Sequence, residues 1–249
     1  MPSPVHGPTA GILVIGEEIL SAKVDEQNAR YLICELRTLG VAVRRIDVVP
    51  DEINEIAEAT ASLSSRFDHV FTSGGVGPTH DDVTMVAVAR AFGLQATRSP
   101  ELEAKIRAAM GANLHERDLR MADIPEGARL VYGPAGDKAR WPVVAVKNVY
   151  ILPGVPEIFR IKFEMVRELF RAGPIFGRAV YCRQGEGPIA ALLDAVVAQF
   201  PSVTVGSYPR FEVGDYKVKI TVDGRDAAQV ERATTALVEG LGAAVVRTE

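Results

Sequence analysis

Residues 72–82, which read TSGGVGPTHDD, place glycines, a histidine and two adjacent carboxylates between an apolar strand pattern and an apolar helix pattern. Glycines at a strand-to-helix turn allow backbone N–H groups to approach an anion such as a phosphate. Carboxylates at the same turn would repel that phosphate unless a cation lay between them. We therefore expect a phosphate-binding turn, formed by Gly74, Gly75, Gly77 and Thr79, next to a divalent cation.

The position of Asp82 allows two interpretations. At the start of the helix pattern either it or its neighbour Asp81 can be only an N-cap, which is worth about 1 kcal/mol. Alternatively Asp82 joins Asp51, which follows the second strand pattern, in binding Mg²⁺ together with ligand phosphates and water. The turn is not a Walker loop, because no Gly-Lys-Ser/Thr follows its glycines. It is not a dinucleotide fingerprint either, because the third Gly is missing from its place.

Strand and helix patterns alternate three times in the N-terminal part of the chain, and this order predicts a parallel sheet with helices on both faces. Short apolar runs at residues 10–16, 41–49, 68–73 and 149–152 are typical of buried strands. Ligands bind beyond the carboxyl ends of such strands, so we expect the four following loops to share one edge. The periodicity fades over residues 112–142.

A different order of elements begins near residue 178, where the sequence patterns predict strand, helix, strand, strand, helix, strand. That is the split order of ferredoxin-like folds. We therefore predict an α/β protein with two domains. Residues 9–172 form a three-layer α/β/α domain with a mostly parallel sheet, and residues 178–249 form a small α+β ferredoxin-like domain.

Composition argues against several classes of partner. The formal net charge is -4, so no basic excess marks a nucleic-acid or anionic-membrane footprint. No apolar run approaches the roughly 18 residues of a membrane helix, and the opening MPSPVHGPTA lacks a signal-peptide pattern. Cys34 and Cys182 are expected to be reduced thiols of a cytoplasmic protein, and Cys34 is expected in the core.

Four segments, GGVGPTHDDVT, VVPDE, IGEEIL and LPGVPE, together resemble the MoaB/Mog (molybdopterin-binding) superfamily. More narrowly, residues 11–170 are similar to the N-terminal domain of CinA-type proteins and to the molybdopterin-binding-like domain of eukaryotic FAD synthase. Residues 120–142, RMADIPEGARLVYGPAGDKARWP, are closer to the FAD-synthase-like branch. The resemblance implies a MoaB/Mog-like fold for the first domain.

The same resemblance implies two candidate functions. The first is metal-dependent hydrolysis of a nucleotide pyrophosphate of the FAD or ADP-ribose type. The alternative is a molybdopterin, pterin or nucleotide binding module, related to molybdopterin adenylyltransferase, without turnover. An acidic pair favours the first, since a pure anion binder gains nothing from carboxylates near a phosphate.

Carried over by position, the resemblance makes Asp51 and Asp82 the catalytic and metal-binding pair, with Mg²⁺, Co²⁺ or another divalent cation as the cofactor. Gly154 and Glu157, in the segment LPGVPE, match a loop at the rim of the site and are expected to contact the substrate. The segment IGEEIL departs from the usual Gly-Asp-Glu, which leaves the role of Glu17 open.

Basic and aromatic residues elsewhere give weaker signals. Lys138 and Arg140 lie in a Gly/Pro-rich segment, where they either clamp an anionic substrate or belong to a solvated loop. Trp141 either stacks on a ligand ring or anchors packing, and His80 is a candidate proton donor to a leaving phosphate. We expect a small-molecule nucleotide or pterin as the ligand and a homo-oligomer, either a dimer or a trimer.

Overall fold

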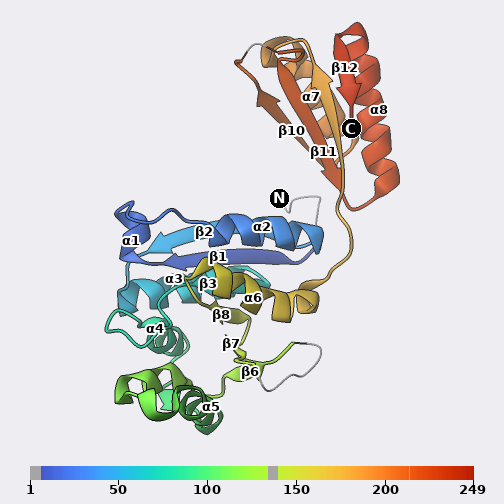
Figure 1. Cartoon of the computed structure of the whole chain (residues 1–249). Coiled ribbons are helices and arrows are strands. Elements are labelled where there is room, and N and C mark those ends of the chain that lie inside the picture. Colours follow the sequence, from blue (N-terminus) through green and yellow to red (C-terminus); the bar gives the residue numbers. More distant parts are fainter. Residues whose placement is uncertain (1–6, 134–139, 213) are drawn as a thin grey trace. The chain divides into compact units, whose positions relative to one another are not determined.

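Two units joined near residue 173 make up the computed structural model shown in Figure 1. The structure describes residues 7–133, 140–212 and 214–249. Residues Pro8–Ala172 form one unit, and residues 173–249 together with Gly7 form the other. The domains expected from the sequence are 9–172 and 178–249. Each unit is described by itself below.

The first unit contains a sheet whose described strands lie in the spatial order β2-β1-β3-β8-β7-β6. These strands are β2 (Ala42–Val49), β1 (Thr9–Ile15), β3 (His69–Ser73), β8 (Val149–Leu152), β7 (Val143–Val146) and β6 (Arg129–Val131). β1 pairs in parallel with β2 and β3, and β3 pairs in parallel with β8. β7 and β6 extend the sheet in antiparallel pairing. The expected mostly parallel sheet is confirmed.

Helices cover both faces of this sheet (Figure 1). They are α1 (Glu17–Leu20), α2 (Asn28–Thr38), α3 (Ile53–Arg66), α4 (Thr84–Ala91), α5 (Pro100–Met110) and α6 (Pro156–Val166). Ile12 and Val14 of β1 pack into the core under α2 and α6, whereas Leu13 and Ile15 pack into the opposite core with α3, α4 and α5. Because both faces are covered, the strand is apolar at consecutive positions instead of alternating. The three-layer α/β/α architecture is confirmed.

The region without a clear period folds into short pieces. β4 (Ala96–Arg98) pairs antiparallel with β5 (Asp123–Pro125), and the 3₁₀ helix η2 (Glu116–Ala122) leads into β5. Leu119 and Ile124 anchor these pieces in the core that also holds α5. Strands of three residues and a 3₁₀ helix are too short to impose a hydrophobic period, so the sequence pattern could not reveal them.

The second unit is an antiparallel sheet in the order β10-β11-β9-β12, with α7 and α8 packed into its core. Its elements are β9 (Phe176–Cys182), α7 (Glu186–Gln199), β10 (Val203–Pro209), β11 (Val218–Gly224), α8 (Ala227–Leu241) and β12 (Val245–Thr248). Along β11, Val218, Ile220 and Val222 are buried while the residues between them are half-buried, as in a sheet covered on one face. The expected ferredoxin-like order is confirmed.

Cys34 is exposed, so the expectation that it lies in the core is wrong. The buried positions of α2 are Asn28, Ala29, Leu32 and Leu36. Cys34 follows Leu32 by two residues, and at roughly 100° per residue it therefore lies on the opposite side of the helix. Cys182, by contrast, is buried in the core of the second unit.

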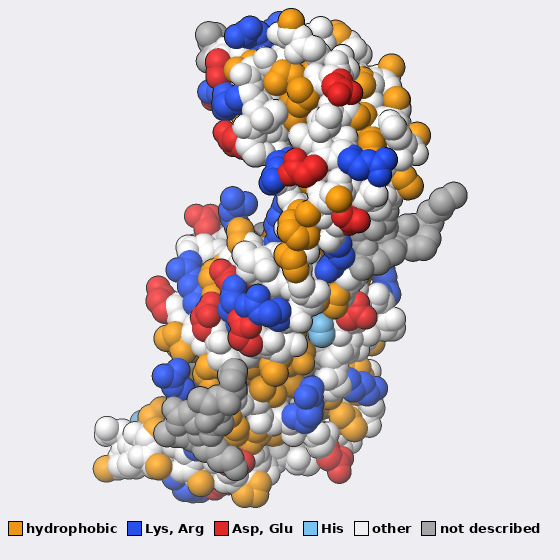
Figure 2. Space-filling model, turned by 90° about the vertical axis from the view of Figure 1, so that its right-hand side faces the viewer, with side chains coloured by type: hydrophobic (Ala, Val, Ile, Leu, Met, Phe, Trp, Pro, Cys, Tyr) orange, Lys and Arg blue, Asp and Glu red, His pale blue; other side chains and the backbone are white. Residues whose placement is uncertain are grey.

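Acidic and basic side chains are interspersed over the face of the molecule seen in Figure 2. That face shows no broad basic area of the kind that binds nucleic acid. In the described part of the chain, no helix combines the length and the apolar character that crossing a membrane requires.

Candidate functional site

Loops at the carboxyl ends of the parallel strands are tied to one another by hydrogen bonds. The backbone N–H of Glu17, after β1, donates to Asp51 Oδ2, after β2, at 2.9 Å. The side-chain amide of Asn28, at the start of α2, donates to Ser73 Oγ at 2.9 Å and to the carbonyl oxygen of Gly154 at 2.7 Å. The four loops thus meet at one edge of the sheet, and Asp51 and Asn28 hold them together.

Glycine is required at position 74 by its surroundings. Gly74 has a φ of +112°, and a Cβ there would lie 2.1 Å from the carbonyl oxygen of Ile15. A Cβ at Gly154 would in turn lie 3.3 Å from the Cα of Gly74. The loops after β1, β3 and β8 are therefore in backbone contact, and a side chain at position 74 would push them apart.

The carboxylate of Asp82 closes the glycine turn. Asp82 Oδ2 accepts hydrogen bonds from the Thr79 backbone N–H at 2.8 Å and from the Thr79 hydroxyl at 2.5 Å. The following helix, α4, has Val83 at its N-cap position and no side-chain cap. The interpretation of Asp82 as a helix cap is therefore wrong. Both of these hydrogen bonds use Oδ2, so Oδ1 is the atom available to a cation or a water molecule.

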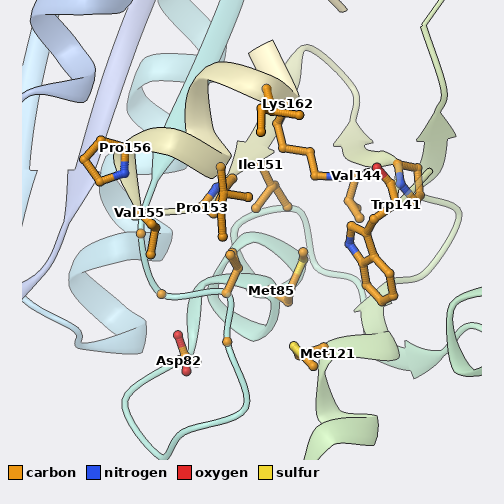
Figure 3. Close-up of a pocket in the computed structure, with 18 of the residues that line it drawn as sticks. Asp82, Met85, Met121, Trp141, Val144, Ile151, Pro153, Val155, Pro156 and Lys162 are labelled. Atoms are coloured by element: carbon orange, nitrogen blue, oxygen red, sulfur yellow. Dashed lines mark hydrogen bonds between the residues drawn. The ribbon is translucent and has the colours of Figure 1, made fainter. Parts of the chain in front are cut away.

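A cavity of about 870 Å³ opens beside this turn (Figure 3). Its wall is mostly apolar and includes Met85, Met121, Val144, Ile151 and Trp141. The charged residues in its wall, within the described chain, are Glu18, Asp82 and Lys162. A largely apolar cavity of this size with few polar groups is typical of a site for a small organic ligand.

The cavity brings together part of the predicted site. Of the predicted residues, Gly74, Gly75, Gly77, Asp82 and Gly154 line it. Among the described residues, Asp51, Thr79, Arg140 and Glu157 do not line it. Thr79 directs its two donors to Asp82 instead of the cavity, and Glu157 is exposed in the first turn of α6. Lys138 lies outside the described residues.

His80 and Trp141 have different surroundings. The side chain of His80 is 96% exposed, and its Nδ1 lies 3.7 Å from the Asp81 carboxylate. Trp141 lines the cavity and also packs against the core that holds α5, so its role in packing is observed and its stacking on a ligand ring stays a prediction. His80 therefore has little to fix it toward a ligand, whereas Trp141 is held in place.

Lys162 is a cavity residue that sequence reasoning missed. It lies on α6, is half-buried, and its ammonium donates to the carbonyl oxygen of Trp141. Burial, with nearby Arg140 and Lys105, lowers the pKa of Lys162 to about 8. The signal was present in α6, where Ile158 and Ile161 add a second apolar side to the helix. The exposed residues Glu157, Arg160 and Glu164 share one side of α6, and at roughly 100° per residue Lys162 falls on the opposite, apolar side.

The donor set near the turn suits a hard divalent cation. In the described residues no cluster of three or more His, Cys, Asp or Glu side chains forms a metal cage. Mg²⁺ needs no such cage, since it is held by one or two carboxylates plus substrate phosphates and water. Asn28 adds a buried oxygen, Oδ1, that has no hydrogen-bond partner among the described groups. Asp51, Asp82 and Asn28 therefore offer the oxygen ligands that this class of ion prefers.

Comparisons with known proteins bear on both units. Residues 11–172 match the family described as "Probable molybdopterin binding domain", and residues 174–249 match the family described as "FAD synthase, middle domain". The resemblance to the MoaB/Mog superfamily, with its FAD-synthase-like branch, is thereby confirmed.

Individual relatives cover most of the chain. A Caenorhabditis elegans protein named "Probable FAD synthase" is 35% identical over an alignment of 266 positions that covers 96% of this chain. The chain spans about half, 51%, of the length of that relative. A protein of Archaeoglobus fulgidus is 35% identical over 222 residues, covering 89% of this chain and 93% of its own length. A solved structure of CinA from Thermoplasma acidophilum, with unknown function, is 32% identical with a TM-score of 0.59, covering 66% of this chain and 98% of that one.

Proposed function

The chain belongs to the molybdopterin-binding domain family, and from this premise we propose that its cavity binds a nucleotide whose pyrophosphate is hydrolysed with a divalent cation. The proposed substrates are dinucleotide pyrophosphates of the FAD or ADP-ribose type. Hydrolysis forms one P–O bond to a water oxygen and breaks one P–O bond of the P–O–P bridge. FAD would give FMN and AMP.

One observation carries this proposal, namely the cavity that places the glycine turn and Asp82 next to a ring-sized apolar chamber (Figure 3). A nucleotide has the matching polarity, because its phosphates are anionic and its ring is flat and largely apolar. The turn would hold the phosphates, and the methionines and Trp141 would contact the ring. A site for inorganic phosphate alone would have no use for the apolar chamber.

A divalent cation would be held by Asp51 and Asp82, with Asn28 Oδ1 as a further oxygen within the same group of loops. When bound, such an ion neutralises phosphate charge and makes phosphorus easier to attack. Its presence would also resolve the conflict between carboxylates and phosphate at one turn.

The remaining steps rest on the protein's own groups. Backbone N–H groups of Gly75 and Gly77 would orient the bridging phosphates, since both glycines line the cavity beside Asp82. Asp82 Oδ1, the oxygen that Thr79 does not engage, would be the metal ligand, and the attacking water would lose its proton to solvent. The Glu17 backbone N–H holds Asp51 at a fixed angle, so Glu17 contributes through its main chain.

A binding module without turnover is the second candidate, and the Thr79–Asp82 contact favours it. Two hydrogen bonds already satisfy one oxygen of Asp82 inside its own loop. A carboxylate held in this way could serve only to shape the turn. The two candidates therefore differ in whether the pair of aspartates is needed for metal-dependent chemistry.

The test is to incubate the full chain with FAD, ADP-ribose or a molybdopterin analogue, each with Mg²⁺, Co²⁺ or chelator, and to separate the products chromatographically. We expect FMN and AMP, or AMP and ribose 5-phosphate, only with metal. Ligand binding is measured in parallel by calorimetry. Tight binding with no product at any metal would leave the binding module as the function.

A further inference from the structure

Lys162 lies at the end of the cavity away from the glycine turn. In Figure 3 it reaches from α6 toward Trp141, while Asp82 lies at the other side of the cavity. Its Nζ donates to the main-chain carbonyl oxygen of Trp141. An ammonium has three N–H donors, so two remain after this hydrogen bond.

The charges around Lys162 are of its own sign. Arg140 and Lys105 act on it electrostatically, and both, like burial, disfavour its charged form. Within the described chain, no carboxylate contributes to the shift of its pKa. A half-buried cation near two other cations has an unfavourable position in the protein alone. An oxygen acceptor supplied by a ligand would remove that disadvantage.

The cavity that Lys162 lines suits a fused ring. Met85, Met110 and Met121 line the cavity together with Trp141. Thioether groups adapt to flat rings and make favourable sulfur–aromatic contacts. A ligand ring between these side chains would present its edge to the Lys162 ammonium.

We propose that Lys162 is a specificity-determining residue that donates to a ring carbonyl oxygen, so that the cavity prefers a fused heterocycle bearing lactam carbonyls over adenine. A carbonyl edge presents oxygen acceptors to the ammonium, whereas the amino edge of adenine presents a donor beside a single ring-nitrogen acceptor, N1 or N7, and so pairs less well with it. Sites built around a polar partner discriminate strongly against ligands that lack it. The inference rests on the proposed function only in placing the ligand phosphate at the glycine turn.

FMN and AMP are matched probes, because each carries one phosphate monoester and they differ in the ring. Binding of each to the full chain is measured without metal by calorimetry, and for FMN also by quenching of its fluorescence. Lys162→Met removes the donors and keeps a flexible apolar chain. Lys147→Met, at the exposed turn between β7 and β8, is the control for loss of one lysine charge.

We expect wild type to bind FMN more tightly than AMP. Lys162→Met should weaken FMN binding about 10- to 100-fold, the range for a hydrogen bond to a charged group. AMP binding should change by no more than about twofold, since adenine offers that lysine no comparable acceptor. Lys147→Met should leave both affinities unchanged. Equal weakening of FMN and AMP, or no preference for FMN in wild type, would overturn the proposal.

A second measurement applies if Lys162→Met fails to fold. The FMN affinity of wild type is followed from pH 7 to 9.5, where the Lys162 ammonium loses its proton, its pKa being about 8. Arg140 and Lys105 face this lysine, and Glu18 and Asp82 line the same cavity. Lys162→Gln retains these four charged residues and supplies a neutral donor in place of the ammonium. Its FMN affinity should therefore depend less on pH than that of wild type. An equal pH dependence in both proteins would contradict a role for the ammonium.

These assays contain no metal and measure no turnover, so they separate this inference from the proposed function. A chain that prefers FMN through Lys162 but never hydrolyses FAD would retain the inference and lose the hydrolase. If wild type hydrolyses FAD and ADP-ribose at equal rates, and Lys162→Met changes neither rate, the hydrolase function is retained and the inference about Lys162 is lost.

Discussion

The two ends of the cavity are built in opposite ways. At the glycine-turn end, Asp82 is hydrogen-bonded within its own loop, and Asp51 and Asn28 are hydrogen-bonded in the adjoining loops, outside the cavity wall. Away from that turn, methionines and Trp141 contribute apolar wall, and the Lys162 ammonium is bonded to the main-chain oxygen of Trp141. The first end fixes its groups by directional bonds, and the second holds its groups by packing.

This difference indicates which part of the site fixes the positions of its side chains most strictly. Directional bonds hold a carboxylate within the narrow geometry that a cation and a reacting phosphate demand. Unbranched apolar side chains tolerate displacement and so adapt to the shape of a ring. We therefore expect substitutions at the glycine-turn end to abolish activity, and those at the lysine end to alter affinity and selectivity.

The largest effect is expected from removing the aspartates. Asp51→Asn and Asp82→Asn should each lower metal-dependent FAD hydrolysis about 10²- to 10³-fold, as for loss of one preorganised electrostatic group. Asn keeps an oxygen for the Glu17 or Thr79 donors, so the loops should remain folded. The double variant should lose little more than either single one, because the pair acts as one unit.

Asp81→Asn is the matched control for these variants. Asp81 is exposed beside Asp82, and it is not among the described residues that line the cavity. Its rate of hydrolysis should equal that of wild type. Additive losses in the double variant would contradict a shared ion, and folding is checked by thermal melting of wild type and all four variants.

The next effect concerns stability at the glycine turn. Gly74→Ala should lower the free energy of unfolding by about 3 kcal/mol, because it combines a disfavoured φ with overlap on the Ile15 carbonyl. Gly93→Ala also has a positive φ, +68°, but its Cβ would meet nothing within 4 Å. We expect it to cost about 1 kcal/mol. Urea denaturation measures both, and equal losses would mean that backbone contact adds nothing at position 74.

A smaller effect is expected at the lysine end, where the free energy of unfolding should depend on pH. Burial lowers the pKa of Lys162 to about 8, below its ordinary 10.5. Above pH 8 the unfolded chain binds more protons than the folded chain, so stability should rise with pH through this contribution. Below pH 8 both states are charged and the contribution is constant. The difference in unfolding free energy between wild type and Lys162→Met, followed from pH 7 to 9.5, should shift in favour of wild type.

Lys147→Met provides the comparison for that pH series. Its difference from wild type over the same range is the baseline for loss of a lysine from an exposed turn. If the Lys162→Met difference follows this baseline, the Lys162 ammonium is solvated in solution and the lysine end is more open than the structure indicates.

The smallest effect is expected from exchanging one apolar side chain for another. Met121→Leu conserves volume, so FMN affinity and stability should each change by less than about 1.5 kcal/mol. Thr79→Val, a swap of similar size at the other end, removes the hydroxyl that donates to Asp82 and should reduce hydrolysis more. Both variants are compared with wild type by the Michaelis constant for FAD and the rate of hydrolysis. A greater loss for Met121→Leu than for Thr79→Val would show that the lysine end tolerates no more change than the glycine-turn end.

Two expectations from the sequence stay predictions. The homo-oligomer, a dimer or trimer, is tested by light scattering on the full chain. The clamp by Lys138 and Arg140 is tested by Lys138→Ala, which should raise the Michaelis constant more than it lowers turnover.

The sequence revealed the glycine-turn end because its contacts are local or follow from strand order. Thr79 and Asp82 are three residues apart, and the loops that carry Asp51 and Gly154 meet wherever parallel strands share an edge. What the pattern could not give was the atom that each carboxylate engages. It therefore left open the N-cap interpretation of Asp82, which the α4 boundary excludes.

By itself, then, the sequence determined the two-domain α/β plan, the mostly parallel sheet and the edge where the loops converge, because hydrophobic period and element order are written along the chain. Only the tertiary structure decided that Met121 of η2, Trp141 before β7 and Lys162 of α6 form one wall, and that Cys34 faces outward. Such contacts join residues many positions apart with no common motif. Their meeting depends on how helices pack on the sheet, which no local pattern encodes.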